Sequence, residues 1–179
     1  KDLDQCTHLI IPGNGSFGSA EPLISALKKF ELARRVNDGL NVLAICLGMQ
    51  ILFERSLESD GIRGLGIFEG VVKPLSSLNV DTSYHIGWEH HSAACNHSFP
   101  RWQAADRWVF FNHGYGVESL NISSQVFTTC LKGEVIASVQ SNNLIATQWH
   151  PECSGRTGIR FIEGFIANGS QADCPLDSF

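Results

Sequence analysis

The stretch "LAICLGMQILFE", residues 43–54, places one cysteine between an apolar run and a helix-like pattern. The apolar residues that lead up to Cys46 predict a short buried strand, and the spacing after it predicts a helix over 47–59. Small residues flank the cysteine, with Ala44 two positions before it and Gly48 two positions after it. A strand that turns sharply into a helix exposes the side chain at the turn.

This position leaves two interpretations of Cys46 open. An isolated cysteine is usually a small buried apolar residue. At a helix N-terminus, however, backbone amides lower the pKa of a thiol and favour the thiolate. The amide of Leu47 would then be placed to receive an oxyanion. Residues elsewhere in the chain are needed to distinguish a structural, buried cysteine from a nucleophile.

The segments before the cysteine alternate between strand and helix patterns. The segment 7–22 predicts a buried strand followed by a glycine-rich turn. The segment 21–39 predicts one amphipathic helix with Leu23, Leu27 and Phe30 on its apolar face. This β-α-β-α order favours a parallel sheet that is covered on both faces.

From about residue 66 the periodicity changes to short alternating segments broken by Gly, Asn and Lys-Gly turns. These segments predict further strands, several of them antiparallel. They lie at 66–75, 108–117, 125–133, 134–143 and 144–152. The segment 155–169 predicts a closing helix with Ile159, Phe161 or Ile162, and Phe165 facing inward. The sequence therefore predicts a mixed α/β domain.

Length and composition limit the class of protein. The 179 residues fit one domain, 1–179, and 43% apolar with 17% charged residues is ordinary for a globular protein. A net charge of −5 argues against nucleic acid or an anionic membrane as a partner. No apolar run reaches the length of a membrane helix. The six cysteines show no paired spacing, so we expect reduced thiols in the cytosol.

A cysteine nucleophile needs a base and a group that orients the base. In "ATQWHPECSG", His150 and Glu152 follow an apolar strand two positions apart, so both side chains can project the same way, with Pro151 stiffening the link. A lone histidine is usually structural, but the strand-cysteine-helix unit upstream makes this pair a candidate base and orienting carboxylate.

The loop "IIPGNGSFG" supplies a third candidate element. Its Pro-Gly-x-Gly run gives the backbone amides unusual freedom, which suits a second oxyanion donor, although the loop taken alone is better explained as a simple tight turn. A phosphate-binding P-loop is excluded, because no Gly-Lys-Ser/Thr follows.

Together these segments resemble the class I glutamine amidotransferases, and most closely the glutaminase subunits of imidazole glycerol phosphate synthase. The resemblance spans residues 7–168 and rests on "LIIPGNGSFG", "CLGMQILFERS", "HIGWE", "FFNHGYGV", "QWHPECSG" and "GIRFIEGFI". It implies a three-layer, flavodoxin-like α/β domain with a mixed, mostly parallel sheet. It also implies a first strand and helix ahead of residue 1, which this chain is expected to lack.

The resemblance implies a role for each matching residue. Cys46 resembles the family's nucleophile, His150 its general base and acid, and Glu152 the carboxylate that orients the base. The other positions are an oxyanion hole of Leu47 with the loop amides of Gly13, Asn14 and Gly15, glutamine contacts at Gln50, Glu58, Gly114 and Tyr115, and a partner-interface position at Trp88.

The implied reaction is hydrolysis of L-glutamine through a glutamyl thioester, with no metal and no organic cofactor. In the family, the ammonia passes to a (β/α)8-barrel cyclase subunit that makes imidazole glycerol phosphate in histidine biosynthesis. The glutaminase is nearly idle until that partner binds its ligand, and a flip of an amide in the Pro-Gly-x-Gly loop is the expected conformational step. We expect a cytosolic heterodimer.

Some positions depart from the family's pattern. Cys153 replaces a lysine that faces the partner, Ala44 replaces a glycine before the nucleophile, and Asn14 stands where a small apolar residue is usual. Two alternatives therefore stay open. One is an amidotransferase subunit of a surface-sugar pathway, and the other is a truncated, catalytically inactive regulatory or binding subunit.

A metal site is the rival from a different class. The segment "HIGWEHHSAACNH" contains His85, His90, His91, Cys95 and His97, a mixture that could ligate zinc. Its spacing matches no familiar zinc site, and "HIGW" already belongs to the family resemblance. The expectation is therefore that no metal is bound.

Overall fold

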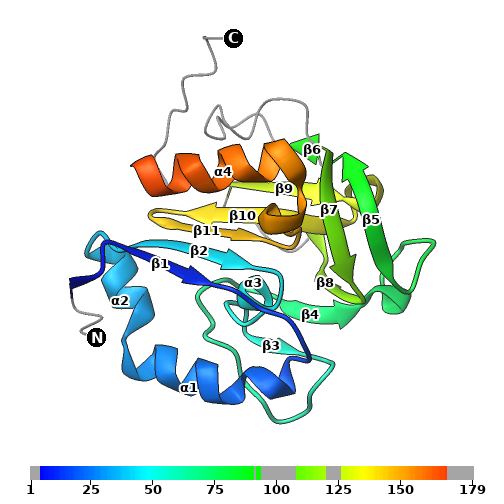
Figure 1. Cartoon of the computed structure of the whole chain (residues 1–179). Helices are drawn as coiled ribbons and strands as arrows, with labels where there is room; N and C mark the ends of the chain where they lie inside the picture. Colours follow the sequence, from blue (N-terminus) through cyan, green and yellow to red (C-terminus); the bar gives the residue numbers. More distant parts are fainter. Residues whose placement is uncertain (1–4, 91, 94–107, 120–125, 169–179) are drawn as a thin grey trace.

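A six-stranded mixed sheet forms the centre of the computed structural model, which describes residues 5–90, 92–93, 108–119 and 126–168. The strand order is β1-β2-β11-β10-β9-β6 (Figure 1). The strands are β1 (His8–Ile11), β2 (Asn41–Ile45), β6 (Ser92–Ala93), β9 (Val126–Cys130), β10 (Val135–Ser141) and β11 (Leu144–Thr147).

The pairing in this sheet divides into a parallel and an antiparallel part. β2 pairs in parallel with both β1 and β11, whereas β10 pairs antiparallel with β11 and β9, and β9 pairs antiparallel with β6. The predicted mixed sheet is confirmed, but the parallel pairs are fewer than expected. A two-residue hairpin joins β10 to β11, with Asn142 at a φ of 49°, and such a turn can only connect antiparallel strands.

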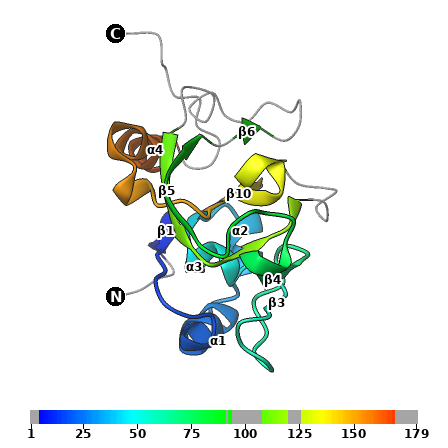
Figure 2. The ribbon, with the colours of Figure 1, turned by 90° about the vertical axis from the view of Figure 1, so that its right-hand side faces the viewer.

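Helices cover both faces of the sheet, as the sequence predicts. α1 (Glu21–Lys29) and α2 (Leu32–Asn37) lie on one face, and α4 (Gly155–Asn168) lies on the other (Figures 1 and 2). Alternate residues of β2 point to opposite faces, because side chains alternate along a strand. Val42 and Ala44 belong to the apolar cluster that contains residues of α1 and α2. Leu43 and Ile45 belong to the cluster that contains residues of α4.

Two of the predicted helices differ in detail. The single helix over 21–39 is wrong, because Glu31 takes a left-handed conformation with a φ of 55° and divides it into α1 and α2. Within α1 Leu27 is buried as predicted, together with Ile24, whereas Leu23 is 37% exposed.

In α4, Phe161 and Phe165 face inward as predicted. Ile159 does not, because 58% of its surface is exposed.

The helix predicted over 47–59 is also wrong, because α3 spans only Leu47–Gln50. Beyond it, the carbonyls of Ile51 and Leu52 accept hydrogen bonds from the backbone of the loop 65–68 instead of continuing the helix. The chain then enters β3 (Arg55–Ser56), whose pairing with a later strand replaces the helical turns that the apolar spacing suggests.

Two smaller sheets complete the fold. One has the order β3-β4-β8, and the other pairs β5 with β7 in antiparallel fashion. Their strands and the short 3-10 turns are β4 (Val71–Pro74), β5 (His85–His90), β7 (Trp108–His113), β8 (Tyr115–Val117), η2 (Gly18–Ala20), η3 (Leu75–Ser77), η6 (Leu131–Gly133) and η7 (Pro151–Cys153). Within the described residues, no helix is long and apolar enough to cross a membrane.

Candidate active site

Cys46 lies where β2 turns sharply into α3. Its backbone has a φ of 52° and a ψ of −110°, a conformation that non-glycine residues rarely adopt. Its amide donates a 2.7 Å hydrogen bond to the carbonyl of Thr147 at the end of β11, and its carbonyl accepts from the amide of Gln50. This strained turn sets the cysteine at the start of α3, as in a nucleophile elbow.

Gly48 allows the turn to pack against β1. A side-chain carbon at this position would collide with the carbonyl oxygen of Ile11. Gly13 has a similar role from the other side, because a side-chain carbon there would collide with Leu47 and with the amide of Gly48. The Pro-Gly-x-Gly loop is therefore pressed against the first turn of α3.

A cavity of about 480 Å³ opens beside Cys46. It brings together residues from four regions of the sequence, and most of the predicted oxyanion and glutamine-binding positions line it. The lining residues are Asn14, Gly15, Cys46, Leu47, Gln50, Glu58, Pro74, Ser76, Ser83, Tyr84, Asn112, His113, Gly114 and Tyr115.

Gln50 and Glu58 are held in the wall of this cavity by hydrogen bonds. Gln50 Nε2 donates to the carbonyl of Tyr115 and to Gln148 Oε1, both at 3.1 Å. Glu58 Oε2 accepts the amide of Phe17 at 2.6 Å, so this carboxylate also fixes the loop that follows β1. Both side chains are thus in place at the cavity before a ligand arrives.

His150 and Glu152 are paired at the end of β11. His150 Nδ1 lies 2.7 Å from Glu152 Oε1, which makes Nδ1 the donor to the carboxylate. The other ring nitrogen, Nε2, is buried and has no hydrogen-bond partner among the described residues. The backbone amide of His150 donates to the carbonyl of Phe110, and the hydroxyl of Ser154 donates to the carbonyl of His150, so the residue is anchored on both sides.

Neither His150 nor Glu152 is among the residues that line the cavity. Their charges nevertheless shift the pKa values of two residues in the cavity wall. Charge on Glu152 raises the pKa of the Cys46 thiol, and charge on His150 lowers the pKa of His113 in the cavity wall.

The expected thiolate is not the resting form of Cys46. Burial raises the pKa of the thiol to about 11. The amide of Leu47 and the side chain of Gln148 donate hydrogen bonds that lower this pKa, while Glu152 raises it, and burial outweighs the donors. α3 has only four residues, so it supplies little more than its first amide. Because the thiol holds its proton at pH 7, a base has to remove it.

Several residues of the site have no individual prediction from the sequence. Gln148 Nε2 lies 3.6 Å from Cys46 Sγ, and Gln148 directly precedes the Trp-His-Pro-Glu run that contains His150. Asn112 and His113 line the cavity just before the predicted Gly114. Two polar residues at the end of an apolar strand are the signal that could have found them.

Trp88 stands apart from the cavity on β5. Its side chain is 52% exposed, and Ile86 on the same strand is 64% exposed. Trp108 on the neighbouring strand β7 is 53% exposed. These three side chains make an exposed apolar edge, and the role of Trp88 in a partner interface stays a prediction.

Of the rival zinc set, the structure describes only two residues, His85 and His90. His85 is buried and His90 is exposed on the same strand, while His91, Cys95 and His97 lie outside the described residues. The structure instead places His85 close to two residues from later strands. The possible ligand atoms of His85, His113 and Cys130 all lie within 4.8 Å of one another.

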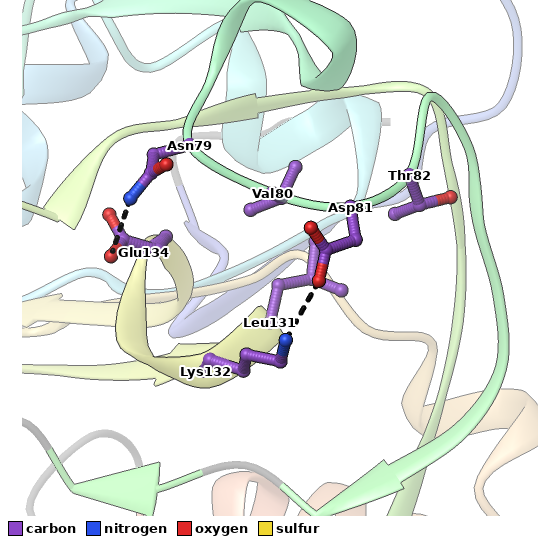
Figure 3. A pocket seen from close by; sticks show the side chains of 7 residues that line it. All are labelled: Asn79, Val80, Asp81, Thr82, Leu131, Lys132 and Glu134. Carbon is purple, nitrogen blue, oxygen red and sulfur yellow. Dashed lines mark hydrogen bonds and ion pairs between the residues drawn. The ribbon is translucent and has the colours of Figure 1, made fainter.

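A second cavity of about 410 Å³ lies over the turn after β9 (Figure 3). The Lys132 ammonium and the Asp81 carboxylate meet at 2.8 Å on its rim, and both side chains are more than 80% exposed. Such an exposed pair contributes little to stability. The side chains drawn in Figure 3 include no pairing of a nucleophile with a base.

Comparisons with known proteins place this geometry in a family. The family model for class-I glutamine amidotransferases matches residues 2–168. The chain is 36% identical to the imidazole glycerol phosphate synthase subunit HisH of Methanocaldococcus jannaschii, over 93% of this chain and 83% of that protein. It is 35% identical to HisH of Prochlorococcus marinus, over 92% and 80%.

Solved structures show the same fold. PurLQS from Thermotoga maritima has a TM-score of 0.60 and 22% identity over 97% of this chain and 78% of that one. A glutamine amidotransferase crystal structure has a TM-score of 0.61 and 16% identity over 89% and 78%. The chain therefore belongs to the class-I glutamine amidotransferase family, and within it to the enzymes related to the HisH subunits of imidazole glycerol phosphate synthase.

Proposed function

We propose that this chain is a glutaminase subunit that hydrolyses L-glutamine at Cys46 and delivers ammonia to a cyclase partner. One observation carries the proposal. His150 commits Nδ1 to Glu152, and its Nε2 is buried with no partner in the part of the chain that the structure describes. His150 also follows β11, the strand that pairs with β2, and the end of β2 carries Cys46. An imidazole held in this way accepts a proton on Nε2.

In the proposed reaction, Nε2 of His150 takes the thiol proton while Cys46 Sγ bonds to the side-chain amide carbon of glutamine. His150 then returns the proton to the departing nitrogen, the C–N bond breaks, and ammonia and a glutamyl thioester result. A water that gives its proton to His150 attacks the thioester, which releases glutamate and restores the thiol. Glu152 stabilises the imidazolium at each transfer.

The oxyanion of both tetrahedral intermediates would lie near the start of α3. The amide of Leu47 is one proposed donor, and the loop Gly13–Gly15 supplies the other. Gly15 has a φ of 114°, so the loop can turn an amide without a side-chain penalty. Gln50, Glu58, Gly114 and Tyr115 are the proposed contacts to the substrate's polar ends.

The proposed partner is a (β/α)8-barrel cyclase that forms imidazole glycerol phosphate. The relatives' names describe subunits of that synthase, which supports this assignment. The exposed apolar edge of Ile86, Trp88 and Trp108 is the proposed docking surface, since aromatic side chains are enriched in such interfaces. We place the enzyme in the cytosol, a reducing compartment in which the free thiol of Cys46 persists.

Labelling with the glutamine-mimicking electrophile diazo-oxo-norleucine tests the proposal. We expect one adduct per chain on Cys46 in the presence of a ligand-bound barrel partner, with protection by L-glutamine. Cys153→Ser is the matched control, because Cys153 is an exposed free thiol outside the cavity. Absence of the adduct under these conditions would favour the inactive subunit. An adduct without imidazole glycerol phosphate synthesis would favour the surface-sugar pathway.

A further inference from the structure

A cluster of three buried residues, His85, His113 and Cys130, has the composition of a metal site. His85 lies on β5, His113 ends β7, and Cys130 ends β9. One possible ligand atom of each residue lies within 4.8 Å of those of the other two. Imidazole nitrogen and thiolate sulfur are ligands that Zn²⁺ prefers in proteins. None of the three residues takes part in the proton transfers proposed for glutamine hydrolysis.

Hydrogen bonds hold one nitrogen of each histidine ring and leave the other nitrogen for an ion. His113 Nδ1 lies 2.8 Å from the carbonyl oxygen of Tyr115, which can only accept, so His113 donates there. His85 Nε2 lies 2.8 Å from Glu89 Oε2, so His85 donates to that carboxylate. Metal-bound histidines almost always donate their second ring N–H to a carbonyl or a carboxylate in this way.

The two remaining nitrogens, His85 Nδ1 and His113 Nε2, face each other at 3.0 Å. With one hydrogen on each ring, both of these nitrogens carry a lone pair, and the two lone pairs repel each other. A cation between them removes this conflict, and it is either an extra proton or a metal ion. A proton joins only two acceptors, whereas the sulfur of Cys130 is a third ligand atom at the same place. The third ligand favours the metal ion.

The spacing of the cluster suits a zinc ion after a small adjustment. Two nitrogens bound at about 2.0–2.1 Å to a tetrahedral zinc ion lie about 3.3 Å apart, and a sulfur bound at about 2.3 Å lies about 3.6 Å from each nitrogen. The two ring nitrogens therefore separate by about 0.3 Å, and the sulfur approaches by about 1 Å. His85 is stacked on Phe111 with ring centroids 4.3 Å apart, which holds its ring in this orientation.

The charges around the cluster balance a divalent cation. Cys130 gives up its proton when it binds the ion and becomes a thiolate. The Glu89 carboxylate contacts His85 through Oε2 and accepts the amide of Leu131, next to Cys130, on Oε1 at 2.6 Å. One thiolate and one carboxylate thus offset the two positive charges of Zn²⁺, so little net charge is buried. The pKa of about 4 that burial gives His113 belongs to the metal-free protein.

We propose that the cluster binds one zinc ion through His85 Nδ1, His113 Nε2 and Cys130 Sγ. A water molecule takes the fourth position of the tetrahedral ion. β5 and β7 form a two-stranded sheet, and β9 belongs to the central sheet. Figure 1 shows β5 and β7 running across the direction of the central strands. The ion therefore fastens the small sheet to the large one, beside the cavity that His113 lines.

Zinc binding to the full chain without an affinity tag tests the stoichiometry. The chain is stripped with a chelator and then titrated with a zinc salt alone. We expect one zinc per chain by elemental analysis after gel filtration, and a urea unfolding midpoint that rises until one equivalent has been added. A chain that elutes without zinc, or a midpoint that zinc leaves unchanged, would overturn the proposal.

Co²⁺ in place of Zn²⁺ reports the ligands. A tetrahedral cobalt site has intense visible absorption bands, and a bound thiolate adds a charge-transfer band in the near ultraviolet. We expect both in the parent chain, and we expect Cys130→Ser to lose the charge-transfer band. Glu89→Gln keeps all three ligands and removes the carboxylate that supports His85, so it should lower the affinity for zinc by about tenfold to a hundredfold. His90→Gln on the same strand is the matched control, because His90 is exposed and should leave the affinity unchanged.

Three further cysteine variants show whether the ion lies at another thiol. Cys46→Ser tests the candidate active site, Cys153→Ser tests an exposed thiol, and Cys95→Ser tests a residue outside the described part of the chain. Each should keep one zinc per chain. Zinc retained by Cys130→Ser, or lost from one of these three variants, would contradict the assignment. If Cys130→Ser does not fold, as judged by circular dichroism, an unchanged zinc affinity in Glu89→Gln would contradict it. All of these readouts are of metal binding, so they do not depend on the proposed glutaminase activity.

Discussion

The Nδ1 atom of His150 lies 2.7 Å from Glu152 Oε1, and the opposite ring nitrogen is buried without a partner among the described residues. An unpartnered buried nitrogen costs free energy of folding unless a ligand or a reaction makes use of it. The carboxylate is 51% exposed, so its contribution is to orient the ring and fix its tautomer more than to stabilise the fold.

Glu152→Gln should lower glutamine hydrolysis by about a hundredfold or more, because the amide no longer holds His150 in the Nδ1–H form or stabilises the imidazolium. The KM for glutamine should change little, since Glu152 does not line the cavity. Steady-state kinetics with the partner present measure both constants. Glu163→Gln on the exposed face of α4 is the control, and an equal loss in that variant would contradict the assignment.

Gln148→Leu should slow alkylation of Cys46 by iodoacetamide several-fold at pH 8 to 9. The amide of Gln148 donates to the sulfur and lowers the pKa of the thiol, so its loss reduces the thiolate fraction further. Exposed Cys153 in the same molecule is an internal reference, because its alkylation should be unchanged. Peptide mass spectrometry resolves the two sites, and faster alkylation of Cys46 would contradict the donor role.

Gly48→Ala should destabilise the protein by about 3 kcal/mol or more, because the added carbon meets the carbonyl oxygen of Ile11 in a packed layer between α3 and β1. Gly164→Ala in α4 is the matched control. A side-chain carbon there has no neighbour within 4 Å, and alanine favours the helix by about 0.5–1 kcal/mol. Urea unfolding measures both, and similar midpoints would show that α3 can move away from β1.

The stability of the protein should rise with pH between about 4 and 6.5 through His113. Burial holds its folded pKa at about 4, below the unfolded value of about 6.5, so the unfolded chain binds more protons in this window. The contribution is complete above pH 6.5 and is lost as pH falls towards 4.

The matching experiment is urea unfolding of the parent and His113→Asn at several pH values in that window. The variant should show a flatter dependence of unfolding free energy on pH, by a few kcal/mol over the range. His90→Gln should keep the slope of the parent, because His90 is exposed. A variant with the parent's slope would assign the dependence to another group.

Much of the fold was predictable from the sequence because its signals are local. The apolar run before Cys46, the small residues around it and the alternation of strand and helix patterns predicted the central strand β2 and its turn, and both are present. The spacing of His150 and Glu152 predicted that the two side chains lie together after β11. In the structure, His150 Nδ1 and Glu152 Oε1 are 2.7 Å apart. The family followed from the same motifs.

Contacts distant in sequence decided the rest. The helix predicted after Cys46 stops at Gln50, because the loop 65–68 bonds to the carbonyls that would continue it. The cavity gains His113 through the pairing of β5 with β7, which no local pattern encodes.

The protonation state of Cys46 was likewise a tertiary outcome. The sequence shows a cysteine at a helix start, where the pKa of a thiol falls. Only the packed structure shows that the thiol is buried among apolar neighbours, where desolvation raises its pKa to about 11. Local sequence thus determined which residues stand at the end of the strand, and packing determined the charge that the thiol carries there, because the dielectric environment of a side chain depends on the whole fold.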